Sequence, residues 1–261
     1  MSGSSWYDEN FKYRWPVAVN VPTGSSGAHN KDVEIVIPSK WDVFWENIQS
    51  TGFDVYCVDY NGNLLTQVRH AFNYANRSLT MRVQNLPVTD SGTFRHTYLI
   101  YIYFGTPSAA NAVTVFTPSS PLSGQIFLGK PTNMVAGDTA NTDGSESAAA
   151  SFSKTIQDQQ YLWFKFDSRL SRRISTYNDF LFYEGLKYVQ VYVKHPTGPT
   201  LQPLMIDDSK TRFLPGWVGI FVQAGTNNLD YLAIADCYTT EEQRFSLRAV
   251  LSIREQYPPA R

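Results

Sequence analysis

The sequence predicts an all-β protein with two jelly-roll-like β-sandwich domains and one short helix near residues 40–49. Apolar and polar residues alternate with a period of two in both halves of the chain, as expected for half-buried strands. Turn-forming sequences separate these runs, and 261 residues are enough for two sandwiches of ordinary size. We therefore expect domains at residues 1–105 and 152–261, joined by a polar linker or extended strap at residues 106–151.

The first domain contains several runs with the periodicity of a strand. Apolar residues at 33, 35 and 37 face one way and acidic residues at 32 and 34 face the other, and alternating apolar positions also occur at 17–21, 53–57 and 79–83. Residues 98–104 are apolar or aromatic throughout, which predicts a central strand covered on both faces. Together these runs predict the strands of one sandwich.

One segment of the first domain breaks the period of two. Its apolar residues recur at i, i+3, i+4 and i+7, the spacing of a helical face: Trp41, Phe44, Trp45 and Ile48. Ser39, with Asp42 three residues later, resembles a capping box, and Gly52 is a stop signal. We expect a short helix over residues 40–49 whose apolar side chains close one end of the sandwich.

The composition changes between the two predicted domains. Prolines interrupt residues 106–121, and residues 137–151 are almost entirely small or polar, which is typical of linkers and loops. Between these stretches, the sequence Gln-Ile-Phe-Leu at residues 125–128 is expected to form an edge strand that opens the second domain.

Alternation returns in the second half of the chain. It is present at residues 162–166, 189–193 and 217–222, with turn-forming sequences between the runs. It is clearest at residues 244–254, where apolar residues point one way and arginines and serines point the other. This last strand is expected to have one solvated face.

The residue types that carry catalysis are scattered along the chain. The four histidines lie singly, without the spacing of a zinc site, and Cys57 and Cys237 are expected to be small buried hydrophobes. The carboxylate pairs at residues 207–208 and 241–242 are sequence neighbours, which we interpret as solvated loop acids rather than a glycosidase pair. We predict no enzymatic activity, no metal and no cofactor.

Two groups of arginines are candidate interface residues. Guanidinium groups pair well with carboxylates and are frequent in protein interfaces, so a subunit contact is one interpretation and ordinary solvated charge is the other. The first group is clustered in sequence and the second lines the solvated face of one strand: Arg169, Arg172 and Arg173, and Arg244, Arg248 and Arg254.

The order of motifs in residues 6–105 resembles a known family. Trp6 is followed by an opening strand YRWPVAV, the aromatic helix, a hairpin FDVYCVDYNG and a closing strand IYIYFG. Together these motifs resemble the DUF2341 family of β-sandwich modules. Cys57 stands where that family usually has threonine, and the turn contains Asn61 and Gly62 in place of Ser-Asp-Gly, although Asn-Gly is itself a strong turn former.

The resemblance implies a non-catalytic module of the kind found in large extracellular, surface and phage-encoded proteins. It therefore implies binding or scaffolding, and it does not extend to residues 106–261.

Charge and targeting signals narrow the class of partner. The 22 basic and 23 acidic residues leave a net charge of −1, so we expect neither nucleic acid nor an anionic membrane as a partner. The chain begins without the pattern of a signal peptide, and no window has the roughly 18 apolar residues of a transmembrane helix. We expect assembly in the host cytoplasm without export.

These observations predict a non-enzymatic virion structural protein of a bacteriophage. A capsid decoration or cement protein fits best, followed by a neck, tail or fibre component. The expected partners are the major capsid protein or other virion subunits, and a homo-oligomer is expected, a trimer by analogy. A carbohydrate-binding β-sandwich module that holds surface glycans through aromatic side chains is the alternative, and a glycoside-active enzyme is the third hypothesis.

Overall fold

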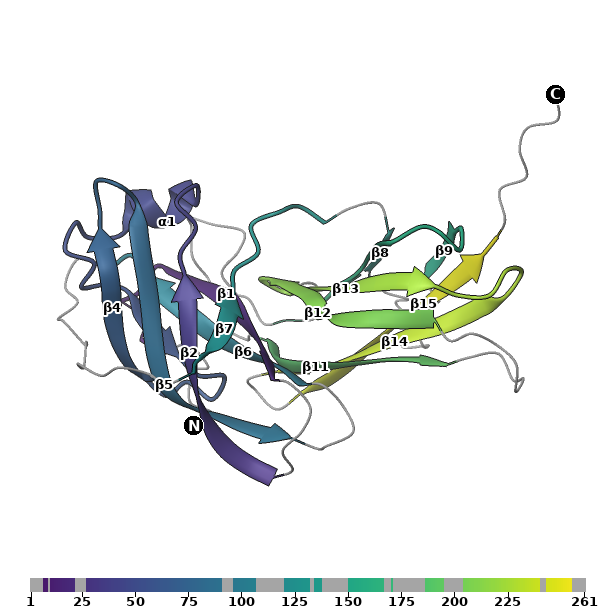
Figure 1. The fold of residues 1–261 in the computed structure, drawn as a ribbon, viewed down its shortest axis with the longest axis horizontal. Coiled ribbons are helices and arrows are strands. Elements are labelled where there is room, and N and C mark those ends of the chain that lie inside the picture. The colour runs from purple at the N-terminus through teal and green to yellow at the C-terminus, as the bar shows by residue number, and fades with distance from the viewer. Residues whose placement is uncertain are drawn as a thin grey trace.

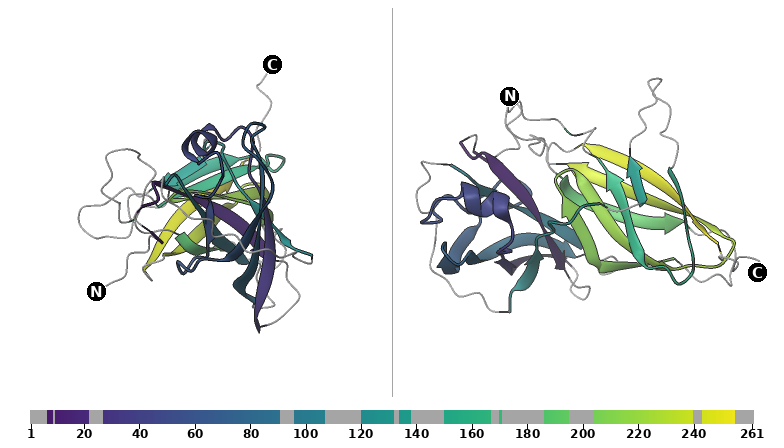
Figure 2. Two further views of the ribbon diagram at one scale, coloured as in Figure 1. Left: turned by 90° about the vertical axis from the view of Figure 1, so that its left-hand side faces the viewer. Right: turned by 90° about the horizontal axis from the view of Figure 1, so that it is seen from above.

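The structure is a computed structural model, and it confirms the all-β prediction with one short helix. Two lobes lie side by side along the long axis, one drawn in purple to blue and the other in green to yellow (Figures 1 and 2). The structure describes these residues: 7–8, 10–21, 27–90, 96–106, 120–131, 134–137, 150–166, 170, 186–194, 204–239 and 243–254.

The first lobe is one strongly curled sheet. Its strands follow the order β4-β5-β2-β7-β1-β6, and β3 pairs with β6. The two ends of this order meet, because the backbone N–H of Cys57 donates to Gln67 Oε1 (2.7 Å) and its carbonyl accepts from Leu65 N (3.0 Å). The strands are β1 (Tyr13–Val21), β2 (Gly27–Val36), β3 (Tyr56–Val58), β4 (Thr66–Asn73), β5 (Ser78–Asp90), β6 (His96–Phe104) and β7 (Leu122–Gln125).

A hydrophobic core, called here the first core, fills this curled sheet. The alternation seen in the sequence places one side chain in two inside it, as predicted for residues 17–21, 33–37 and 79–83. The fully buried members from these strands are Val17, Val19, Val33, Ile35, Met81 and Val83.

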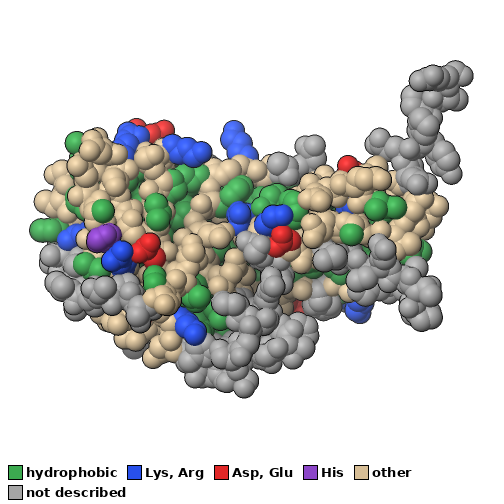
Figure 3. Space-filling model, viewed as in Figure 1, with side chains coloured by type: hydrophobic (Ala, Val, Ile, Leu, Met, Phe, Trp, Pro, Cys, Tyr) green, Lys and Arg blue, Asp and Glu red, His purple; other side chains and the backbone are tan. Residues whose placement is uncertain are grey.

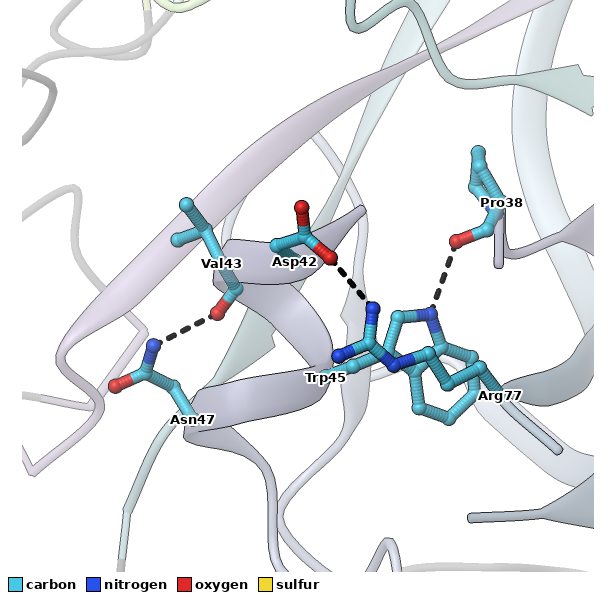
Figure 4. A network of polar contacts seen from close by, with 6 residues as sticks. All are labelled: Pro38, Asp42, Val43, Trp45, Asn47 and Arg77. Carbon is cyan, nitrogen blue, oxygen red and sulfur yellow. Dashed lines mark hydrogen bonds and ion pairs between the residues drawn. The ribbon is translucent and has the colours of Figure 1, made fainter. Parts of the chain in front are cut away.

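The predicted helix is present and closes one end of the first core. Helix α1 spans Asp42–Asn47, and its four predicted apolar residues Trp41, Phe44, Trp45 and Ile48 are all buried. The Phe44 ring lies 4.9 Å from the Trp41 ring and 5.0 Å from the Phe104 ring at the end of β6. Trp45 donates from Nε1 to the Pro38 carbonyl at 2.9 Å, which fixes the indole over the sheet (Figure 4).

The predicted helix caps are wrong. Trp41 occupies the N-cap position, and no side chain there bonds the first turn. Asp42 instead pairs with Arg77 of the β4–β5 hairpin, so its carboxylate serves a tertiary contact (Figure 4). The helix ends at Ile48 in extended conformation, and Gly52, with φ +64°, forms the following turn rather than the helix stop.

The strand expected at residues 125–128 lies elsewhere in the sheet. β7 spans Leu122–Gln125 and runs between β2 and β1, parallel to the former and antiparallel to the latter, so the predicted edge position is wrong. Gly124 makes this possible, because a Cβ at this position would lie 2.7 Å from Ile35 Cγ1. The segment expected to be a linker thus supplies a strand to the first lobe.

The second lobe is a sandwich of two sheets. One has the order β12-β13-β10-β8, and the other consists of β11-β14-β15-β9, which continue the sheet of the first lobe. Figure 1 shows β12 and β13 lying over β11 and β14. The strands are β8 (Met134–Gly137), β9 (Ala150–Lys154), β10 (Gln160–Lys165), β11 (Leu186–Lys194), β12 (Leu204–Leu214), β13 (Trp217–Ala224), β14 (Asp230–Thr239) and β15 (Arg244–Ile253).

A second core lies between these two sheets. It contains Leu162 and Val218 from one sheet and Ala235 and Leu251 from the other. The solvated face predicted for residues 244–254 is confirmed, because buried and exposed residues alternate along β15.

Strand β6 is the wall between the two cores. Leu99, Tyr101 and Tyr103 face the second core, whereas the alternate residues Ile100 and Ile102 face the first. Burial on both faces was predicted for this strand and is confirmed. β6 also pairs with β11 through Tyr98 and Tyr188, and the Tyr101 hydroxyl donates to the Leu186 carbonyl at 2.6 Å. The two lobes therefore share one sheet, and strand β6 contributes side chains to both cores.

Candidate interaction surfaces

The aspartates of the hairpin motif are structural. Asp54 is fully buried and accepts hydrogen bonds from the backbone N–H groups of Gln49 (2.9 Å) and Gly105 (3.1 Å). It thereby ties the chain after α1 to the chain after β6. Burial raises the pKa of Asp54, and the backbone donors act in the opposite direction.

The second aspartate of the motif holds the hairpin turn. Asp59 Oδ1 accepts from the backbone N–H groups of Asn61 and Asn63, both at 2.8 Å. Gly62 has φ +85°, a conformation that glycine adopts without strain. The turn predicted at Asn61 and Gly62 is confirmed. The two aspartates of the motif hold the backbone through hydrogen bonds, which is a structural role.

A buried lysine is also used structurally. Lys154 at the end of β9 is 3% exposed, and its Nζ donates to the carbonyls of Thr155 (2.6 Å) and Ala224 (2.9 Å). Burial lowers the pKa of Lys154. The contact joins the ends of β9 and β13, which belong to opposite sheets of the second lobe.

Both cysteines are free and buried, as predicted. Burial raises the pKa of the Cys57 thiol, so the reactive thiolate is disfavoured at neutral pH. In the part of the chain that the structure describes, no group of three or more His, Cys, Asp or Glu side chains could hold a metal ion. The same residues contain no helix long and apolar enough to cross a membrane.

The predicted arginines at residues 244, 248 and 254 lie in β15 or directly after it, on the outer face of the second lobe. We call Arg244, Arg248 and Arg254 the arginine face. Arg244 pairs with Asp236 (2.6 Å), whose carboxylate is 3% exposed and also accepts from Ser246 Oγ. Arg254 pairs with Asp230 at 2.6 Å. Arg248 lies between these two pairs along the strand and is exposed.

The other predicted group, Arg169, Arg172 and Arg173, lies outside the described residues. The structure therefore brings together only the arginines of β15. Of the three, Arg244 and Arg254 are both matched by acidic partners within the same sheet, which leaves the arginine face balanced in charge at its two ends.

A second surface lies on the opposite side of the second lobe, on the outer face of β10 and β13. Directly opposed residues of neighbouring strands share a face, and the register pairs Tyr161 with Phe221 and Lys165 with Trp217. The residues between them, such as Leu162, point into the second core. We call the outward side chains Tyr161, Trp163, Lys165, Lys210, Trp217 and Phe221 the aromatic–lysine face.

Lysines lie over the aromatic rings at both ends of this face. Lys210 Nζ is 4.1 Å from the centre of the Phe221 ring and 3.1 Å from Asp207 Oδ2. Lys165 Nζ is 5.3 Å from the centre of the Trp217 ring. Such cation–π contacts are favourable when the rings are partly desolvated, as these half-buried rings are. Figure 3 shows Lys and Arg side chains beside hydrophobic ones where Figure 1 places β12 and β13.

Trp163 forms the floor of the aromatic–lysine face. It is fully buried although it points away from the core, and its ring lies flat over Gly219, where a Cβ would come within 2.8 Å of the indole. Phe127 and Tyr161 lie beside it, at ring distances of 5.5 and 5.7 Å. The Trp163 Nε1 donor is buried and has no hydrogen-bond partner among the described residues.

The aromatic–lysine face was missed by the sequence reasoning, although part of its signal is present. Residues 161, 163 and 165 alternate with apolar residues, as do residues 217, 219 and 221. Each run alone indicates a strand with one aromatic outer face. Only the register between β10 and β13 joins the two runs into one surface, and register is not encoded in either run.

Comparisons with known proteins leave the family open: no protein-family model matches this chain, and no curated protein matches it. The resemblance of residues 6–105 to DUF2341 modules therefore stays a prediction from the motifs.

Proposed function

We propose that the protein is a non-enzymatic structural component of a bacteriophage virion that acts through protein–protein contacts. A capsid decoration or cement role ranks first, followed by a role in the neck, tail or fibre. Its partners would be the major capsid protein or other virion subunits, and the chain would act there as a homo-oligomer assembled in the host cytoplasm.

The shared strand β6 is the observation that carries this proposal. Because its side chains fill both cores, a movement of one lobe against the other would disrupt packing in both. A two-lobed body of this kind holds its outer surfaces at fixed positions, which is what a protein that bridges neighbouring subunits needs. The arginine face and the aromatic–lysine face lie on opposite sides of the second lobe and could engage two different neighbours.

The use of the buried ionisable groups supports the non-enzymatic part of the proposal. Asp54, Asp59 and Lys154 are all engaged by backbone groups. Catalytic acids and bases, in contrast, need a geometry that leaves them facing a substrate. Their observed partners stabilise turns and strand ends instead.

The copy number of the chain in purified particles tests the proposal. Particles would be isolated by density gradient from cultures that produce the protein and quantified by mass spectrometry against their major capsid protein. We expect a fixed ratio of small whole numbers that survives repeated gradients. A chain that is expressed but absent from the particles would contradict the proposal.

A charge-reversal variant identifies the contact surface in the same experiment. Arg248→Glu places a negative charge on the arginine face. If this face contacts an acidic surface of a neighbouring subunit, the variant creates an unfavourable like-charge contact, so we expect a lower copy number in particles. Lys40→Glu, at an exposed position directly before α1 in the first lobe, is the matched control and should be incorporated normally. Equal incorporation of both variants would remove the arginine face from the interface.

A further inference from the structure

We propose that the aromatic–lysine face is a binding site for acidic oligosaccharides. This inference goes beyond the structural role, because it assigns a class of small ligand to this surface. It rests on three features of the face: partly exposed aromatic rings, cationic side chains placed over those rings, and more basic than acidic side chains among the residues that the structure describes.

The rings have the spacing of a short oligosaccharide. Trp217 and Phe221 are four residues apart on β13, which places them roughly 13 Å apart at about 3.3 Å per residue. Sugar rings present an apolar face of C–H groups that packs against aromatic side chains. A ligand of about three sugar units would therefore reach from one ring to the other.

The inclination of the rings decides the shape of the ligand. The Tyr161 and Phe221 rings are 5.2 Å apart and inclined by 69°, so they form a corner rather than a flat platform. A flat, crystalline polysaccharide surface needs coplanar rings and would touch only one of them. The face is suited to a single soluble chain or a chain end, which can place one sugar in the corner.

The charges decide the chemical class. Lys165, Lys210 and Arg212 lie on or beside the face, and Asp207 is the acidic partner of Lys210. Arg212 donates to Gln125 Oε1 at 2.7 Å, a neutral acceptor that leaves its charge uncompensated by that contact. Among the side chains of this face that the structure describes, these three basic groups outnumber the single acidic one, and such a surface is complementary to uronic, sialic or sulfated sugars.

In the proposed complex, a sugar ring would take the place that each lysine ammonium group now occupies over an aromatic ring. A sugar that stacks on Trp217 or Phe221 would displace the ammonium group from the ring face, and that group could then pair with a carboxylate or sulfate of the same ligand. A neutral sugar would displace the lysine ammonium groups from the rings without offering them an acidic partner, so we expect it to bind more weakly.

The experiment uses the full chain on a glycan array that carries uronate, sialylated and sulfated oligosaccharides beside their neutral counterparts. We expect binding to acidic glycans, weaker binding to the neutral ones and a loss of affinity as salt increases. Titration of the best acidic glycan by calorimetry then compares variants. Trp217→Ala and Lys165→Gln should each lower the affinity by about tenfold or more.

The chain offers a matched control for the lysine variant. Lys187 lies 5.7 Å from the centre of the Tyr60 ring, a cation–π pair away from the proposed site, and Lys187→Gln should leave glycan binding unchanged. Circular dichroism and thermal unfolding would show that each variant is folded.

Three outcomes would overturn the glycan site. These are an array without bound acidic glycan, equal binding of acidic and neutral glycans, and equal affinity of Trp217→Ala, Lys165→Gln and the wild type. If instead these two variants lost only their association with particles, the face would be a protein interface and not a glycan site. The three outcomes on the array and in calorimetry do not depend on the copy number in particles, so the structural role and the glycan site fail separately.

Discussion

Two buried carboxylates of the first lobe, those of Asp54 and Asp59, accept hydrogen bonds from backbone N–H groups. Asp54 and Asp59 bracket the hairpin that contains β3, and each bonds two backbone donors from other positions in the chain. The two oxygens of the Asp54 carboxylate accept from different backbone donors, and the single acceptor oxygen of an amide could not serve both in the same geometry. These hydrogen bonds give both acids of the DVYCVD sequence at residues 54–59 a structural role.

The substitution Asp54→Asn tests this function at the residue scale. The amide keeps one acceptor oxygen and places an NH₂ group against the second backbone donor, so we expect a loss of about 1–3 kcal/mol in the free energy of unfolding. Urea denaturation of both proteins at neutral pH measures the difference. An unchanged stability would mean that water replaces the missing acceptor.

The same variant removes a pH dependence. Because the pKa of Asp54 in the folded protein is raised above 3.8, the folded state holds a proton that the unfolded state has already released. The wild type should therefore lose stability relative to Asp54→Asn as the pH rises from 3.8 through the raised value. A relative gain over this window would contradict the burial of this carboxylate.

At the scale of the element, the period-two pattern predicted most of the strands. Local sequence did not predict the segments whose structure depends on neighbouring strands or on contacts distant in sequence. β15 and the double burial of β6 were predicted because their side-chain patterns are complete within each strand. β7, with the sequence Leu-Ser-Gly-Gln, has no such pattern and becomes a strand because β1 and β2 supply hydrogen-bond partners on both sides. The α1 face was predicted from its spacing, whereas the role of Asp42 depends on its ion pair with Arg77, a contact distant in sequence.

The variant Gly124→Val tests the account of β7. The added side chain would meet Ile35, Val17 and Val33 inside the first core, so we expect overpacking to cost about 1–3 kcal/mol of stability. Ser123→Val is the matched control, because the neighbouring residue is exposed and should change stability by no more than about 0.5 kcal/mol. Denaturant midpoints for the two variants compare them directly, and equal midpoints would contradict the close packing around Gly124.

On the scale of the whole molecule, the two lobes are joined by covalent chain, hydrogen bonds and shared side-chain packing. Besides β6, the pair formed by Arg212 and Gln125 and the ring contact between Phe127 and Trp163 connect the first lobe's β7 segment to the second lobe. The domain boundaries predicted at residues 105 and 152 rest on changes in composition. Composition does not reveal which strands pair across such a boundary. The candidate surfaces were partly hidden for the same reason, since each depends on the register of strands distant in sequence.

The central claim is that β6 makes one rigid body of both lobes, and calorimetric unfolding tests it most directly. Leu99 and Ile100 are neighbours in β6 that face opposite cores, so Leu99→Ala and Ile100→Ala each remove packing from a different lobe, at a cost of about 2–5 kcal/mol. We predict a single transition for the wild type, with calorimetric and van't Hoff enthalpies equal, and a lower temperature of that same transition in both variants. Two separate transitions, each lowered by only one of the variants, would contradict the claim.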